Sequence, residues 1–110
     1  MDAPRQIAAL SDGTRREIIQ ILSVAPRSVA DIARHLPVSR PAVSQHLSVL
    51  KEAGLVTVHH QGTRNVYRLN PEGMAVLRDY LDTLWQKALE QFKTKAEQPL
   101  ATIRRDEDGT

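Results

Sequence analysis

Apolar residues recur at helical spacing along the first part of the chain. They predict a short helix over Pro4–Leu10, which the polar stretch Ser11-Asp12-Gly13 interrupts. They predict a second helix over Thr14–Val24, and Pro26 ends it because the residue before a proline avoids the helical conformation. The chain is therefore expected to begin with two helices.

Two further helices are predicted with a very short connection between them. The first, Ser28–Leu36, begins at a serine suited to an N-cap and stops at Pro37. The second has Ser39 as its N-cap and runs to Ala53, after which Gly54 supplies a left-handed C-cap. Each of these helices has one apolar face and one polar face.

The apolar period then shortens from that of a helix to that of a strand. Leu55–His60 and Asn65–Leu69 are rich in Val, Thr and Tyr, and a glycine-containing turn lies between them, so a β-hairpin is predicted. Asn70 is then a cap and Pro71 the first residue of a long last helix. Two amphipathic helices joined tightly and followed by a polar-tipped hairpin are typical of a winged helix-turn-helix. The predicted fold is mainly α with a small β-hairpin: five helices plus this wing.

The last helix has an apolar stripe that is too long for one small domain to cover. The stripe consists of Met74, Leu77, Leu81, Leu84, Trp85, Ala88 and Phe92. A helix from a second copy of the chain is the simplest cover, so a homodimer is expected. The interface residues expected from this stripe are Leu77, Leu81, Leu84, Trp85 and Ala88. The folded domain is expected over residues 1–98, with a disordered tail over 99–110.

The outward face of the fourth helix and the tip of the hairpin have the groups that bind double-stranded DNA. Amides, hydroxyls and guanidinium groups match the base edges and phosphates of a duplex. The expected DNA-binding residues are Ser39, Arg40, Ser44, Gln45, Ser48, His60, Gln61, Thr63 and Arg64. Gln45 is expected to read a base from a rigid helix. Arg64, as a cation at a flexible tip, is expected to contact phosphates or the minor groove.

Charge and composition agree with a nucleic-acid partner. Residues 1–70 contain nine Lys/Arg against five Asp/Glu, whereas residues 71–110 contain six against eight, so the basic excess lies in one part of the chain.

The absence of cysteine excludes disulfides and thiolate ligands. No apolar run is typical of a signal peptide or a membrane span, so a cytoplasmic protein without a membrane partner is expected.

Two stretches of the chain resemble the ArsR family of winged-helix repressors. They are residues 9–18, ALSDGTRREI, and residues 43–56, VSQHLSVLKEAGLV, and the resemblance covers about residues 3–95. It implies that the recognition helix and the wing contact operator DNA. The resemblance further implies that the first and last helices build the dimer, which adds Ile7 and Leu10 to the expected interface. It also implies that Arg40, Ser44 and Gln45 stand at base-reading positions. Pro41 departs from the family, which often has a polar residue there.

The metal sites that many ArsR proteins use do not match this sequence. One family site is a Cys-Val-Cys-Asp-Leu run on the third helix, where this chain has Ser28-Val29-Ala30-Asp31-Ile32. The other needs Asp and His on the last helix, and all four histidines here precede it. With Tyr80 and Trp85, the chain resembles the metal-free, autorepressor-like branch of the family. No metal and no cofactor are therefore expected.

Two other functions are less well supported. A winged helix used only for protein contact would have no need of the outward polar groups at Arg40, Ser44, Gln45 and Arg64. An enzyme is the other alternative, but the sequence shows no Cys nucleophile, no glycine-rich phosphate loop and no carboxylate pair tied to a cleft. The operator, the regulated genes and any small-molecule inducer stay open.

Overall fold

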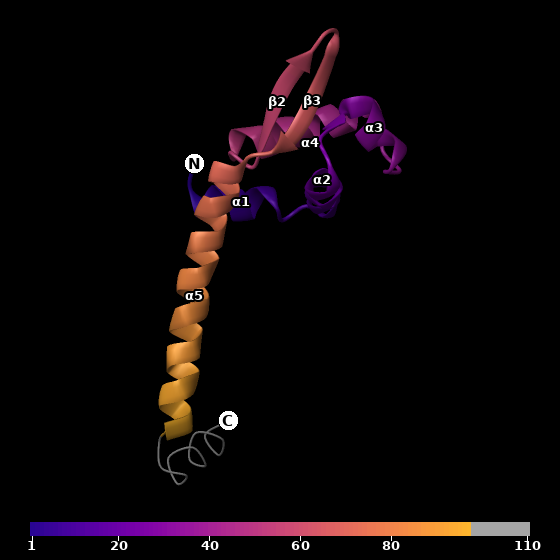
Figure 1. The fold of residues 1–110 in the computed structure, drawn as a ribbon. Coiled ribbons are helices and arrows are strands. Elements are labelled where there is room, and N and C mark those ends of the chain that lie inside the picture. Colours follow the sequence, from indigo (N-terminus) through magenta and orange to yellow (C-terminus); the bar gives the residue numbers. More distant parts are fainter. Residues whose placement is uncertain (98–110) are drawn as a thin grey trace. The chain divides into compact units, whose positions relative to one another are not determined.

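The computed structural model describes residues 1–97, which contain five helices and a three-stranded sheet (Figure 1). The elements are α1 (Ala3–Ala9), α2 (Gly13–Val24), β1 (Arg27–Ser28), α3 (Val29–Arg34), α4 (Arg40–Glu52), β2 (Val56–Gln61), β3 (Arg64–Leu69) and α5 (Pro71–Glu97). The chain forms two compact units, one over Met1–Arg78 and one that begins at Asp79, so α5 contributes to both. The tail predicted over 99–110 lies outside the described residues.

The predicted serine caps are confirmed. The Ser28 hydroxyl accepts a hydrogen bond from the backbone N–H of Asp31 at 3.2 Å, and the Ser39 hydroxyl accepts one from Ala42 at 3.3 Å. These bonds satisfy N–H groups that the first turn of a helix leaves without partners. Most predicted boundaries differ from the observed ones by at most one residue, and the largest difference is in α3, which ends at Arg34 instead of Leu36. Pro37 explains the difference, since it disfavours the helical conformation in the residue before it.

Gly54 ends α4 in the left-handed conformation, with φ 79°, as predicted. Its N–H donates to the carbonyl of Lys51 and the N–H of Leu55 donates to Leu50, which is the hydrogen-bond pattern of a Schellman cap. The start of α5 lies directly against this turn. A Cβ on Gly73 would stand 1.7 Å from the Gly54 carbonyl oxygen, so only glycine fits there.

The predicted hairpin is confirmed, and a third strand joins it. Strands β2 and β3 pair antiparallel from Val56↔Leu69 to Gln61↔Arg64, so the turn contains only two residues. The two-residue strand β1 pairs with the other edge of β3, which gives the order β1-β3-β2. The sequence analysis did not predict β1, because two residues are too few to show an alternating pattern. This strand ties the beginning of α3 to the wing, defined here as the hairpin β2–β3.

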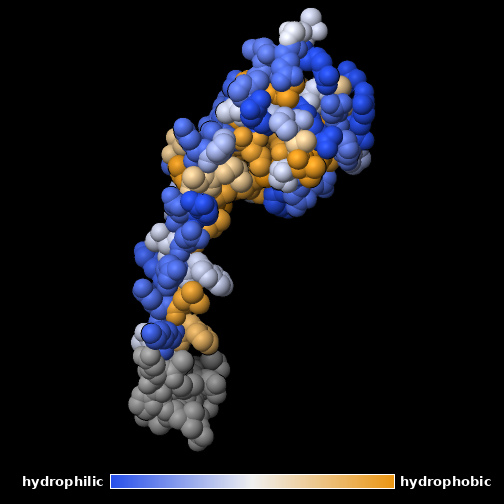
Figure 2. Space-filling view, viewed as in Figure 1, coloured by the Kyte–Doolittle hydropathy of each residue, from blue (hydrophilic) through white to orange (hydrophobic). Residues whose placement is uncertain are grey.

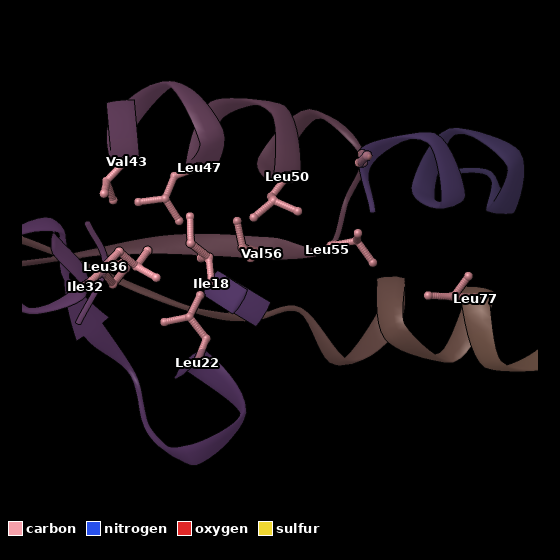
Figure 3. Packing of buried hydrophobic residues seen from close by; sticks show 12 residues of the cluster. Ile18, Leu22, Ile32, Leu36, Val43, Leu47, Leu50, Leu55, Val56 and Leu77 are labelled. Atoms are coloured by element: carbon pink, nitrogen blue, oxygen red, sulfur yellow. The ribbon is translucent and has the colours of Figure 1, made fainter. Parts of the chain in front are cut away.

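The core of the first unit is built by the apolar faces of α2, α3 and α4 and by the start of the wing. Figure 3 shows Val43, Leu47 and Leu50 of α4 pointing toward Ile18 and its neighbours. The buried cluster consists of Ala9, Ile18, Leu22, Ile32, Leu36, Val43, Leu47, Leu50, Ala53, Leu55, Val56 and Leu77. Because α4 packs its whole inner face into this cluster, its outer face is held rigidly toward solvent.

The part of α5 in the second unit exposes a continuous set of large apolar side chains, called here the α5 apolar face. It consists of Tyr80, Leu81, Leu84, Trp85, Leu89 and Phe92, all of which are exposed. Figure 2 shows apolar surface beside strongly hydrophilic surface along this segment. Of the other predicted interface residues, Leu77 is buried in the first unit's own core, Leu10 packs partly against that core, and Ile7 is exposed. No helix in residues 1–97 is long and apolar enough to span a bilayer.

Candidate nucleic-acid interface

Helix α4 presents its polar residues on the face opposite the core. Val43, Leu47 and Leu50 are completely buried. The predicted reading residues on the other side are all exposed, namely Ser39, Arg40, Ser44, Gln45 and Ser48. The side chains of Arg40, Ser44, Gln45 and Ser48 form no hydrogen bond or ion pair with any residue that the structure describes. A rigid helix with donors and acceptors that have no intramolecular partner is suited to reading base edges in the major groove.

The next residue along α4, His46, connects the helix to the N-terminal end of α2. Its Nδ1 lies 3.9 Å from a carboxylate oxygen of Asp12 and 3.4 Å from Nη1 of Arg15. Asp12 also caps α2 by accepting from the N–H of Arg15, and the Arg15 Nε donates to the carbonyl of Ala9. The sequence analysis did not single out this cluster, because His46 is more than thirty positions from Asp12 and Arg15. It fixes α4 against two other helices.

The environment of Asp12 favours its charged form. The hydrogen bond from the Arg15 backbone lowers the pKa of the Asp12 carboxyl, and partial desolvation opposes this effect. The charges of His46 and Arg15 lower it further, so that its pKa is below the usual value. The carboxylate is therefore present at neutral pH to cap α2 and to face His46.

Side chains at the tip of the wing are exposed, and one pair is joined across the strands. His60, Gln61, Thr63 and Arg64 are all exposed, as predicted. The Nδ1 of His60 lies 2.6 Å from the Oδ1 of Asn65, the residue directly opposite it in the hairpin. Sequence reasoning missed Asn65, although a two-residue turn at Gly62 sets this register and would have identified the pair. The His60 Nδ1 and the Asn65 Oδ1 therefore already have a partner within the hairpin.

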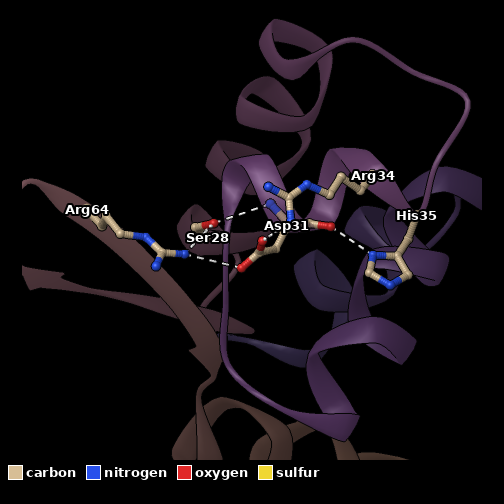
Figure 4. A network of polar contacts seen from close by, with 5 residues as sticks. All are labelled: Ser28, Asp31, Arg34, His35 and Arg64. Carbon is tan, nitrogen blue, oxygen red and sulfur yellow. Dashed lines mark hydrogen bonds and ion pairs between the residues drawn. The ribbon is translucent and has the colours of Figure 1, made fainter.

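Arg64 is held in place instead of projecting freely from the tip. Its Nη2 donates to the Ser28 hydroxyl at 3.1 Å and to a carboxylate oxygen of Asp31 at 3.2 Å (Figure 4). The sequence analysis treated Arg64 as a cation at a flexible tip, and the structure corrects that premise. The side chain nevertheless stays 62% exposed, so the rest of the guanidinium remains accessible to a phosphate or a base.

Asp31 stands at the centre of this network. The carboxylate also pairs with Arg34 at 3.2 Å, and its backbone carbonyl lies 2.8 Å from the Nδ1 of His35. Desolvation raises the pKa of the Asp31 carboxyl, but the Ser28 hydrogen bond and the charges of Arg34 and Arg64 outweigh it. The net pKa is lower than usual, so Asp31 is charged at neutral pH.

The described residues contain no group of three or more His, Cys, Asp or Glu side chains placed to hold a metal ion. At the start of α3, where the resemblance suggested comparison with a metal site, Ser28 and Asp31 are bonded to Arg64. The oxygen atoms in this region therefore serve a contact between α3 and the wing.

Comparison with known proteins identifies the family. Residues 12–58, which span α2 to β2, match the model of the bacterial regulatory protein arsR family. The chain is 58% identical over 81 residues to the HTH-type transcriptional regulator Rv2034 of Mycobacterium tuberculosis, covering 74% of this chain and 76% of that protein. The chain belongs to the arsR family.

A further relative and a solved structure agree with the fold and the class of activity. The transcriptional repressor SdpR of Bacillus subtilis is 38% identical over 74 residues, which are 67% of this chain and 79% of that protein. The homodimeric winged helix-turn-helix DNA-binding domain of Mb0332 from Mycobacterium bovis superposes with a TM-score of 0.63 at 32% identity, covering 80% of this chain and 82% of that one. This arsR-family chain is thus a transcriptional regulator with a DNA-binding winged helix-turn-helix, and not an enzyme.

Proposed function

We propose that this regulator is a cytoplasmic repressor that binds an inverted-repeat operator as a homodimer and needs no metal ion. The observation that carries the proposal is the outer face of α4. Four polar side chains there, Arg40, Ser44, Gln45 and Ser48, are exposed and have no partner among the described residues. No hydrogen bond or ion pair of these side chains stabilises the described fold, whereas their groups match the donor and acceptor pattern of a major groove.

Within this face, Gln45 is assigned to base reading. An amide offers both a donor and an acceptor, which is the pattern that adenine presents in the major groove. The helix that carries it is anchored by a buried inner face and by the cluster of His46 with Asp12 and Arg15. This anchoring gives the amide a fixed approach to the base. Ser39, Arg40, Ser44 and Ser48 surround it, with the wing residues His60, Gln61, Thr63 and Arg64 as further contacts.

The homodimer is supported by the α5 apolar face. Leu81, Leu84, Trp85 and Ala88 line an open groove together with Asp82. Contiguous apolar surface of this kind is rare on monomers and indicates a partner surface. An identical helix from a second copy would cover it, and the resulting dimer would contain two α4 helices, one for each half-site. The homodimeric state of the similar Mycobacterium bovis domain supports the same assembly.

Regulation without a metal is supported by the chemistry of the chain. It contains no cysteine, and Ser28 and Ala30 occupy the positions of the thiolates in the family's third-helix site. Elemental analysis of purified protein is expected to find no stoichiometric zinc, and a chelator is expected to leave DNA affinity unchanged. About one zinc per chain, or a change in affinity on chelation, would contradict this part of the proposal.

Selection from a random duplex library by the full-length protein tests the proposed DNA function. The expected result is an enriched inverted repeat with half-sites about one helical turn, roughly 34–36 Å, apart. Enrichment of a single half-site would contradict the two-fold arrangement. Equal affinity for all duplexes would contradict sequence-specific repression and indicate non-specific DNA binding. Binding to no duplex at all would favour a winged helix that binds only protein.

A further inference from the structure

The contact between Arg64 and α3 connects two parts of the DNA-binding surface that are far apart in sequence. Arg64 opens strand β3, and its Nη2 reaches Ser28 and Asp31, which are 36 and 33 positions earlier (Figure 4). Helix α3 packs directly on α4. The residues that orient the Arg64 guanidinium therefore lie at the start of α3, the helix that packs against the reading helix α4.

We propose that Asp31 is a positioning residue that converts Arg64 from a general phosphate contact into a contact that discriminates between DNA sequences. This inference rests on the proposed function, because it concerns how the same surface recognises an operator. A freely rotating arginine adapts to any phosphate and adds affinity for every duplex. An arginine held by a carboxylate approaches from one direction only, so its donors fit some sequences or groove widths better than others.

The geometry leaves the guanidinium able to act in this way. The group has five N–H donors in a rigid plane, and the hydrogen bonds to Asp31 and Ser28 involve Nη2 alone. The side chain is 62% exposed, and Nε and Nη1 form no hydrogen bond with the described residues, so they are available as donors to DNA. Because Nη2 donates to two different acceptors, the two hydrogen bonds together restrict rotation of the guanidinium plane. The loss of side-chain freedom on DNA binding is thereby reduced before the duplex arrives.

The charges around Asp31 keep its carboxylate from opposing the DNA phosphates. The carboxylate pairs with Arg34 as well as with Arg64, each at 3.2 Å. The three side chains together have a net charge of one positive unit. The network can therefore lie near a polyanion while Asp31 stays ionised and bound to Arg64. Arg34 is itself 73% exposed and forms no hydrogen bond or ion pair with the wing among the described residues.

Asp31→Asn is the test variant, because it preserves the size of the side chain and removes the charge that holds Arg64. The probes are the duplex enriched by wild-type protein and a scrambled duplex of the same composition. The ratio of the two affinities should fall about tenfold in Asp31→Asn. The ratio should fall by a similar factor in Arg64→Ala and in the double variant, because Asp31→Asn and Arg64→Ala remove the same discriminating contact of Arg64 with DNA. Arg34→Ala is the matched control and should weaken both duplexes equally, leaving the ratio unchanged.

Each other outcome contradicts the proposal. Tighter binding of both duplexes by Asp31→Asn would show that Asp31 competes with DNA for Arg64 or repels the phosphates. A ratio that falls further in the double variant than in Arg64→Ala would show that Asp31 acts on discrimination without Arg64. An unchanged ratio in Asp31→Asn would show that positioning is irrelevant. A wild-type protein that does not discriminate at all would overturn the proposed function together with this inference.

A spectroscopic measurement on the DNA-free protein separates positioning from a general loss of fold. The ¹⁵N relaxation of the Arg64 Nε–Hε group should report restricted motion in the wild type and free motion in Asp31→Asn. The signals of the buried core, such as those of Leu47 and Ile18, should stay in place in both proteins. Equal Arg64 mobility in the two proteins would contradict the positioning role, whatever the DNA titrations give.

Discussion

Leucines in the two units of the molecule have very different surroundings. Leu47 and Leu50 of α4 are 0% exposed, whereas Leu81 and Leu84 of α5 are 48% and 47% exposed. The first pair lies among apolar residues of α2, α3 and the sheet, which one chain supplies. The second pair lies on the α5 apolar face, where the described residues supply no cover. The same residue type thus stabilises the fold in one unit and remains available for a partner in the other.

This difference indicates what each unit contributes to function. A fully packed core fixes the orientation of the polar residues on the outer face of α4. An uncovered apolar face has its main energetic effect only when a second chain buries it. Substitutions in the first unit should therefore change the unfolding of each chain, whereas substitutions in the second should change the association of two chains.

The largest effect is expected for Leu47→Ala. Removing a completely buried leucine side chain leaves a cavity, and the free energy of unfolding should fall by about 2–5 kcal/mol. Urea denaturation followed by circular dichroism measures the change. Val49→Ala is the control on the same helix, because Val49 is 40% exposed, and it should cost less than about 1 kcal/mol. Equal losses for the two variants would show that α4 does not pack as described.

Trp85→Asp should have the next largest effect, and it should act on the association of two chains into a dimer. Trp85 is 64% exposed, and a tryptophan anchor typically contributes about 2–4 kcal/mol to an interface. The dimer dissociation constant should rise roughly 100-fold, as seen by light scattering over a dilution series. Val24→Asp is the control, because Val24 is 77% exposed on α2, outside the proposed interface. A dimer of unchanged affinity in Trp85→Asp would place the interface elsewhere.

Gln45→Ala should affect DNA recognition without affecting the fold. The side chain is exposed and has no partner among the described residues, so the free energy of unfolding should be unchanged. Affinity for the selected duplex should fall by about 1–3 kcal/mol, with little change for the scrambled duplex. Gln20→Ala, an exposed glutamine on α2, is the matched control and should change neither affinity. Equal weakening on both duplexes would make Gln45 a phosphate contact.

The smallest effect is expected from acid titration of Asp12. Its pKa is lowered in the folded chain, first by the Arg15 backbone hydrogen bond, so its ionised form stabilises the fold. That stabilisation is complete above the ordinary carboxyl pKa of about 3.9 and is lost as the pH falls through the lower folded value. Urea unfolding of Asp12→Asn should therefore depend less on pH below about pH 4 than unfolding of the wild type. Identical pH dependence would contradict this role of Asp12.

Local sequence patterns predicted most of the fold. Helical spacing of apolar residues located the helices, Ser28 and Ser39 identified two caps, and Gly54 identified the end of α4. These features depend on residues within a few positions of one another. The two-residue strand β1 has no such pattern and is formed only because β3 offers it an open edge.

The site was predicted in part, for the same physical reason. The exposed polar face of α4 follows from helical periodicity, so Gln45 and its neighbours could be placed from sequence. The bonds from Arg64 to Asp31 and from His46 to Asp12 join distant positions, and only the tertiary structure brings them together. The burial of Leu77 within the first unit was likewise hidden, because an apolar stripe does not reveal which chain covers it.

The stoichiometry of the complex with DNA tests the central claim most directly. Sedimentation equilibrium of the full-length protein, alone and with the selected duplex, measures the number of chains in each species. The account predicts a dimer without DNA at micromolar concentration and two chains on each duplex. A stable monomer without DNA that binds the duplex one chain at a time, with full affinity, would contradict it.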